Sequence, residues 1–195
     1  MRYDKGQKEA TRNRIIEAAA MRFRRDGIKA VGVASLMSDI GLTQGGFYNH
    51  FASKEDLARE VLIEALAATR ERLAAAGMAA DGLAPLVNFY LRAQHRDHPE
   101  NGCAAAALAA DVARGPLATK AAFTAELRKT VTLIGERLPK SMKPKQRRET
   151  AQAIFASMMG TLVLARAVDD AALSDELLAA GRRAALALAS PEQTS

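Results

Sequence analysis

The segment from Gly41 to Phe51, Gly-Leu-Thr-Gln-Gly-Gly-Phe-Tyr-Asn-His-Phe, constrains the fold of this chain more than any other stretch. It follows an apolar segment with helical spacing and precedes a strong helix start at 53–57, which leaves room for a turn and one short helix. Phe47 and Phe51 are four residues apart, so they share one face of that helix. The opposite face carries glycines and small polar residues, which a buried core does not need. We therefore expect a short helix that buries one face and leaves the other almost bare.

Two further helices are expected in front of this segment. Residues 8–26 have apolar residues at helical spacing, and Gly27 is well placed to stop the helix. A second helix is expected at 33–40, and Thr43 is a suitable N-cap for the third, at 44–50. Two short helices joined by a tight turn that contains glycine are typical of the helix-turn-helix motif.

The rest of the chain also predicts helices. Alanine and leucine dominate, and runs of β-branched residues are short, which favours an all-α protein. Ser53 is expected to cap a long helix, with Asp56 where a capping box usually has Glu or Gln. The remaining helices are expected at 83–97, at 103–114, from after Pro116 to about 138, at 145–168 and at 174–189.

These elements predict an all-α fold of about nine helices in two parts. Residues 1–52 form an N-terminal helix-turn-helix head of three helices, and residues 53–195 form a C-terminal helical bundle. The helix at 53–76 connects the two parts.

Charge and composition narrow the class of function. The net charge is +6, and residues 1–30 carry nine basic side chains against four acidic ones, which favours an anionic partner. Cys103 is the single cysteine, so no internal disulfide is possible and a reducing compartment is expected. The chain starts without an apolar signal core and has no apolar run near ~20 residues, so we expect a cytoplasmic protein without a membrane partner. We find no phosphate-binding glycine loop, metal-ligand cluster or nucleophile with a base, and therefore expect no enzyme, no cofactor and no metal site.

The third helix and its flanks are expected to contact double-stranded DNA. Glycines inside a short helix cost roughly 1 kcal/mol each relative to alanine, but they allow the backbone to approach a groove closely. Gln44 suits an adenine edge in the major groove, and the other polar side chains suit phosphates. The alternative is a loop whose glycines only turn the chain. The predicted DNA contacts are Thr43, Gln44, Gly45, Gly46, Tyr48, Asn49, His50 and Lys54, with Arg12, Arg14 and Lys29 as weaker candidates.

The stretch from Ile15 to Leu57 resembles the DNA-binding head of the tetracycline-repressor (TetR) family of bacterial regulators. The resemblance rests on Ile16-Glu17-Ala18-Ala19, Phe23, Gly27, Val33 and 40–43, and above all on 45–57 with its pattern Tyr-x-His-Phe-x-x-Lys. It departs from the family at 35–39, where an Ile-Ala pair is common, but apolar bulk is retained. The resemblance implies that Tyr48, His50 and Lys54 contact phosphates and that 44–46 face bases. It also implies a helical body that dimerises through its last two helices and holds an effector pocket.

The last two helices have an independent signal for dimerisation. The penultimate helix is apolar on more than one face, so it needs partners on several sides, and small residues in the last helix permit close approach of a second copy. The alternative is that both helices fill the core of a monomer. The predicted dimer-interface residues are Phe155, Met158, Met159, Leu162, Leu177, Gly181, Ala184 and Leu188.

The alanine-rich segment 101–114 suggests the position of a ligand pocket. Its small side chains leave space beside larger groups, although the same alanines also permit tight packing without a cavity. The predicted ligand-binding residues are Phe89, Tyr90, Cys103, Ala107, Phe123 and Phe155.

Other residues of this region have competing interpretations. Cys103 at a helix start is either a thiol sensor or a small buried apolar residue. His95 and His98 have the spacing of metal ligands, but Pro99 breaks the geometry, and Asp111 with Arg114 is expected to form a surface ion pair.

Together these features predict a sequence-specific transcriptional regulator. We expect a homodimeric repressor that a small molecule, whose identity the sequence does not reveal, releases from a palindromic operator. The alternative is a regulator that senses oxidants or electrophiles through the Cys103 thiol.

Overall fold

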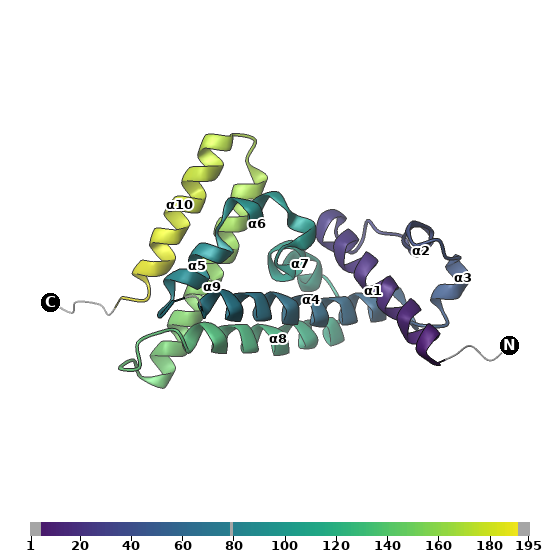
Figure 1. Cartoon of the computed structure of the whole chain (residues 1–195), viewed down its shortest axis with the longest axis horizontal. Helices are drawn as coiled ribbons and strands as arrows, with labels where there is room; N and C mark the ends of the chain where they lie inside the picture. Colours follow the sequence, from purple (N-terminus) through teal and green to yellow (C-terminus); the bar gives the residue numbers. More distant parts are fainter. Residues whose placement is uncertain (1–4, 79, 191–195) are drawn as a thin grey trace.

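The computed structural model of the chain describes residues 5–78 and 80–190, and this part of the chain is built from helices without a strand (Figure 1). The all-α prediction is therefore confirmed for these residues, while 1–4, 79 and 191–195 of the two predicted parts lie outside them. The elements are α1 (Lys5–Asp26), α2 (Val33–Asp39), α3 (Gln44–Phe47), α4 (Lys54–Gly77), α5 (Ala84–Tyr90), α6 (Ala93–Asp97), the 3₁₀-helix η1 (Pro99–Asn101), α7 (Ala104–Ala113), α8 (Leu117–Gly135), α9 (Pro144–Ala167) and α10 (Ala171–Ala187).

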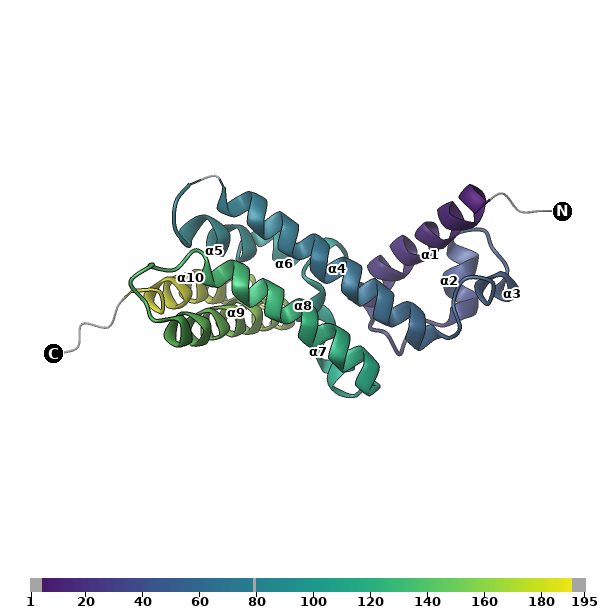
Figure 2. The same ribbon diagram turned by 90° about the horizontal axis from the view of Figure 1, so that it is seen from below.

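The first three helices gather around the N-terminal end of α4, and α4 continues into the larger part of the molecule (Figures 1 and 2). There α8 runs along α4, while α9 and α10 lie side by side and form the far end. Buried apolar residues form one continuous core from Ile15 in α1 to Ala185 in α10. The division at residue 52 therefore stays a prediction, because the core does not stop there.

Local sequence signals account for the turns and caps in the first part of the chain. Gly27 and Gly41 end α1 and the α2 turn with φ of +83° and +71°, a backbone region that favours glycine. The Ser53 side chain accepts a hydrogen bond from the Asp56 amide (3.1 Å) and so caps α4. In return, the Asp56 carboxylate accepts from the amide of Ala52 (3.3 Å), one residue earlier than in a standard capping box.

Three predictions about these elements differ from the structure. α3 ends at Phe47 instead of residue 50, and the chain continues in tight turns up to Phe51. Thr43 precedes α3, but its side chain makes no capping hydrogen bond. The single helix expected at 83–97 is divided into α5 and α6, and the described residues hold ten α-helices, in keeping with the expected number of about nine.

The break between α5 and α6 has a tertiary cause. At the break, the carbonyl of Tyr90 hydrogen-bonds with Nδ1 of His95 (2.6 Å), and the carbonyl of Leu91 accepts from Arg182 of α10 (2.6 Å). Side chains therefore satisfy backbone acceptors that a continuous helix would use internally. No glycine or proline marks this position, so a local reading could not predict it.

Candidate nucleic-acid interface

The inner face of the segment 44–51 is an aromatic pair. Phe47 and Phe51 are almost fully buried, and their rings stack with centroids 5.5 Å apart. They lie in the same core as Met37 of α2 and Ile15 and Ala19 of α1. This packing sets the orientation of α3, because turning α3 about its axis would expose both rings.

The outer face of the same segment is open. Thr43, Gln44, Gly45 and Asn49 are exposed, and the Tyr48 side chain is 60% exposed although its ring touches Phe47 edge-on (5.2 Å). An exposed tyrosine among small residues, above a rigid aromatic support, is a surface suited to a partner. Five of the predicted DNA contacts, Thr43, Gln44, Gly45, Tyr48 and Asn49, are therefore exposed, while Gly46 is half-buried.

No steric contact within the described chain requires glycine at position 45 or 46. A Cβ atom on Gly45 would meet nothing within 4 Å, and one on Gly46 would make only ordinary contacts of 3.7 and 3.8 Å with Thr43 and Met37. Neither residue has a positive φ. Glycine weakens a helix relative to alanine, and no contact within the described chain requires it at these two positions.

Lys54 and His50, the predicted phosphate contacts beside this surface, are constrained within the chain, Lys54 by a hydrogen bond and His50 by burial of its Nδ1 atom. The Lys54 ammonium donates to the carbonyl of Lys29 (3.2 Å), which holds it beside the start of α4. The Nδ1 atom of His50 is buried without a hydrogen-bond partner among the described residues. Burial, with the nearby charges of Lys8 and Arg12, lowers the pKa of His50 and favours its neutral ring.

Two arginines that were weaker candidates for DNA contacts are engaged within the chain. Arg12 pairs with Glu60 of α4, and its guanidinium lies over the Phe51 ring, 4.7 Å from the centroid. Arg14 donates to the carbonyl of Ile40 (2.8 Å). Both side chains therefore tie α1 to its neighbours, while Lys29 is exposed.

The predicted dimer residues fall into two groups. Phe155, Met158, Leu162 and Gly181 are buried inside the chain itself, and a Cβ on Gly181 would lie only 2.3 Å from the Thr161 side chain. Gly181 therefore serves the α9–α10 contact of a single chain, and Phe155, Met158 and Leu162 belong to its core. The other four, which are half-buried or exposed, are Met159, Leu177, Ala184 and Leu188.

The predicted ligand residues do not enclose one large cavity. Tyr90, Cys103 and Phe155 are buried in the core, with the Tyr90 and Phe155 rings 6.1 Å apart. Ala107 and Phe123 are half-buried. A small space of about 30 Å³ does lie beside Phe89 and Tyr90, and it adjoins a larger polar pocket of about 250 Å³.

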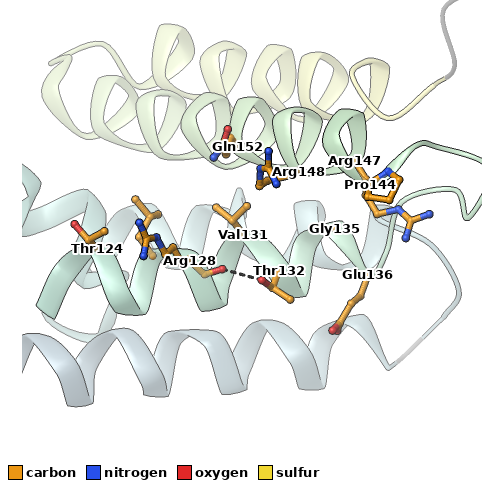
Figure 3. Close-up of a pocket in the computed structure, with 11 residues that line it drawn as sticks. Thr124, Arg128, Val131, Thr132, Gly135, Glu136, Pro144, Arg147, Arg148 and Gln152 are labelled. Carbon is orange, nitrogen blue, oxygen red and sulfur yellow. Dashed lines mark hydrogen bonds between the residues drawn. The ribbon is translucent and has the colours of Figure 1, made fainter. Parts of the chain in front are cut away.

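A groove of about 760 Å³ lies between α8 and α9 (Figure 3). Its floor includes Val131 and Gly135, and Arg128 and Arg148 come from its two walls. The sequence did not indicate this groove, because its shape depends on how α8 and α9 pack against each other. None of the predicted ligand residues lines it.

The His95 ring is hydrogen-bonded to two backbone groups. Its Nδ1 hydrogen-bonds with the Tyr90 carbonyl, and its Nε2 accepts from the Cys103 amide (2.9 Å). Burial lowers the pKa of His95 to about 4, helped by nearby guanidiniums such as that of Arg166 and opposed by the Tyr90 carbonyl. Both ring nitrogens are thus occupied by backbone groups, which leaves no lone pair for a metal.

The start of the chain matches a known family of proteins. Residues 15–61 match the family described as "Bacterial regulatory proteins, tetR family". The chain is 35% identical to the probable HTH-type transcriptional regulator ArpR of Pseudomonas putida over 86 residues, which are 44% of this chain and 40% of that protein. It is 37% identical to the HTH-type transcriptional repressor KstR2 of Mycobacterium tuberculosis over 57 residues, 29% of this chain and 28% of that protein. The match thus spans less than half the length of either relative.

Solved structures extend the likeness of fold to the whole molecule. The reduced form of Escherichia coli NemR superposes with a TM-score of 0.74 at 19% identity and covers 94% of this chain and 100% of that chain. A tetR-family regulator from Cytophaga hutchinsonii superposes with a TM-score of 0.76 at 19% identity and covers 97% and 100%. At this identity the likeness shows the fold.

Proposed function

We propose that this chain, whose residues 15–61 are a TetR-family DNA-binding domain, is a transcriptional regulator that reads DNA with the surface 43–49. The observation that carries the proposal is the pair Gly45 and Gly46, which nothing inside the chain requires. Bare backbone at this point allows base edges to approach, with Gln44 on one side and Tyr48 on the other. Lys54 and His50 then face the phosphates beside the groove.

A homodimer suits this proposal. Large apolar side chains remain exposed on α9 at Val163 and Leu164 and on α10 at Leu173 and Leu188. A Cβ on Gly160 of α9 would meet nothing within 4 Å, so this glycine also has no steric reason inside the chain. A second copy seated on α9 and α10 would cover these residues and place two heads on a palindrome with half-sites about 34–36 Å apart.

Repression with release by a small molecule is the form of regulation that we propose. A ligand that binds one arrangement of the body better would shift the population of dimers towards that arrangement. α4 would transmit this change from the body to the head, because its first turn packs in the head while the rest packs against the body. Heads that move off the half-site spacing would then lose affinity for the operator.

The thiol alternative is supported by one feature of the fold neighbours, since NemR was solved in a form called reduced. In this chain the Cys103 side chain is 1% exposed. An oxidant would therefore need a local opening to reach the thiol. Retention of ligand-dependent release in Cys103→Ala would rule out this alternative.

The function is tested by selecting bound sequences from random duplex DNA with the purified protein and footprinting the selected site. We expect a palindrome protected on two adjacent major-groove turns. The double variant Tyr48→Ala with Lys54→Ala should lose affinity, while Lys145→Ala, an exposed lysine in the first turn of α9, should not. No enriched sequence, or equal affinity of all variants, would contradict the proposal.

A further inference from the structure

Guanidinium groups gather where the head meets the body. Arg24 of α1 donates to the carbonyl of Glu100 (2.6 Å), and Arg72 of α4 donates to the carbonyl of Asn101 (2.8 Å). Arg166 of α9 donates to the carbonyls of His95 and Arg96. These three arginines therefore hold the turn around η1 through neutral acceptors.

This cluster has little negative charge to balance it. Among the described residues, no ion pair is formed by Arg24, Arg72, Arg92 or Arg166. Glu100 is the carboxylate beside them, and it faces His98 (3.2 Å). Burial lowers the pKa values of Arg24 and Arg166, which shows that their environment disfavours the positive charge.

Two buried hydrogen-bond donors belong to residues that line one small space. The Tyr90 hydroxyl and Nε of Arg92 are buried without a hydrogen-bond partner among the described residues, and both residues line the small space of about 30 Å³. Native proteins rarely leave such groups unpaired, so each calls for a partner. Because an arginine N–H can only donate, that partner must be an acceptor.

The small space lies beside the pocket of about 250 Å³, and basic and uncharged polar side chains line both. Arg72, Arg92, His95 and Asn101 line both, while His98 and Gln94 line the outer pocket alone. No Asp or Glu lines either space. Phe89, whose ring lies under the Arg92 guanidinium at 3.9 Å, supplies an apolar wall to the inner space.

We propose that this junction pocket binds a compact anion, a carboxylate or phosphate group, between Arg72 and Arg92. One oxygen of the anion enters the inner space and accepts from Nε of Arg92 and from the Tyr90 hydroxyl. The rest of the molecule lies in the outer pocket, which is smaller than a typical drug-sized site of ~300–1,000 Å³. Charge-assisted hydrogen bonds to guanidinium groups are the interactions that recognise such anions most strongly.

The site also connects to the head. Arg72 lines the pocket and holds the Asn101 carbonyl, while Arg24 of α1 holds the neighbouring Glu100 carbonyl. An anion that draws the Arg72 guanidinium towards itself would loosen this turn where α1 is attached. The effect on DNA rests on the proposed function, whereas the binding of the anion does not.

The binding test uses the full chain with inorganic phosphate and with benzoate as probes, each titrated calorimetrically against chloride at equal ionic strength. We expect saturable binding of at least one probe. Benzoate binding would identify an organic anion, and phosphate binding alone would identify a free oxyanion or a phosphate group. Saturation by neither probe would overturn the proposal.

Three variants locate the binding. Arg92→Gln removes a guanidinium that makes no hydrogen bond among the described residues, and it should weaken binding by about tenfold or more. Tyr90→Phe removes only an unpaired hydroxyl, so the fold should persist while affinity falls. Arg128→Gln, the matched control, removes the same charge from an exposed arginine in the α8–α9 groove and should bind as the parent does. Equal weakening in Arg92→Gln and Arg128→Gln would show non-specific screening and overturn the site.

A last measurement separates the two proposals. The affinity for the selected duplex is compared with and without the anion that bound. A fall in affinity in the parent but not in Arg92→Gln is the expected result. An anion that binds normally to a protein without affinity for any duplex would contradict the proposed function and leave the site in place.

Discussion

Single residues in this protein are informative about function where no contact within the chain requires their residue type. Gly45 is a helical glycine with open space where a Cβ would stand, and Gly41 is a turn glycine with a φ of +71°. The same residue type thus has a structural reason at 41 and none at 45. The fold requires glycine at 41, whereas at 45 we propose that glycine serves a partner.

Gly45→Ala is predicted to stabilise the protein and weaken its binding to DNA. The free energy of unfolding should rise by up to about 1 kcal/mol, because alanine favours the helix and meets no neighbour. Chemical denaturation and a titration with the selected duplex measure the two effects. Gly41→Ala is the control, and it should lower stability because alanine is strained at positive φ. A stabilised Gly45→Ala with unchanged affinity would contradict a close approach at this residue.

His95 makes stability depend on pH. Its pKa is about 4 in the folded chain, below the 6.5 of a free histidine, so the unfolded chain takes up a proton that the folded chain refuses. This contribution is complete above pH 6.5 and is lost as pH falls towards 4. The loss reaches about 3 kcal/mol, since a tenfold change in proton affinity is worth about 1.4 kcal/mol.

Unfolding free energies at about pH 7 and about pH 5 test this prediction, because the histidine is neutral in both states only at the higher value. His95→Gln has no ring to titrate, so its stability should fall less with acid than that of the parent. The same fall in both proteins would show that other groups cause the acid dependence.

At the scale of elements, α4 and α8 are joined by a buried carboxylate. Glu126 of α8 is almost fully buried and accepts from Arg70 of α4 (2.6 Å) and from Lys129 (2.5 Å). Burial by itself would raise the pKa of Glu126, but these two cations outweigh it and the pKa is lowered. The α4–α8 contact therefore includes an ion pair between Arg70 and a buried carboxylate.

Arg70→Ala is predicted to lower the free energy of unfolding by about 1–3 kcal/mol, because Glu126 keeps Lys129 but loses its bond to α4. Arg70→Ala with Glu126→Gln should recover part of this loss, since the buried charge is then removed as well. Lys145→Ala, which breaks an exposed pair with Glu149, is the control and should change stability by less than about 0.5 kcal/mol. Equal effects of Arg70→Ala and Lys145→Ala would show that the buried pair contributes nothing.

At the scale of the whole molecule, the head and the opposite end of the folded molecule present surfaces of different kinds. The head offers polar residues and bare backbone at 43–49, and the far end offers exposed apolar residues on α9 and α10. Within the described residues, no helix is long and apolar enough to span a membrane. A second copy is the partner that we propose for the apolar end.

Leu164→Lys is predicted to weaken the homodimer. Leu164 is 56% exposed on α9, so a lysine there is tolerated by the monomer but places a charge in the proposed interface. Sedimentation at decreasing concentration should show dissociation earlier than in the parent, and DNA affinity should fall with it. Leu117→Lys changes a leucine that is 82% exposed at the start of α8 and should leave the dimer intact. Equal behaviour of both variants would place the interface elsewhere.

The positions of most elements follow from local signals in the sequence. Apolar spacing, Gly27, Gly41 and the Ser53 cap predict α1, α2 and α4 within a few residues of their observed ends. The ion pair between Asp111 and Arg114 is confirmed (2.8 Å). Its second contact was not foreseen, because Asp111 also accepts from the amide of Ile28 (2.9 Å) and joins α7 to the end of α1.

The sequence by itself determined an all-α chain with a helix-turn-helix near its start, because these depend on spacing, caps and glycines that are local. Tertiary structure contributed to where α5 ends, because Arg182 of α10 satisfies the carbonyl of Leu91 from a distant part of the chain. It also decided which apolar residues of α9 stay exposed, since Met158 and Leu162 are buried in the core while Leu164 is 56% exposed. The guanidinium cluster at the junction is likewise a consequence of tertiary structure. Its arginines lie on α1, α4, the α5–α6 link and α9, and only packing brings their charges together.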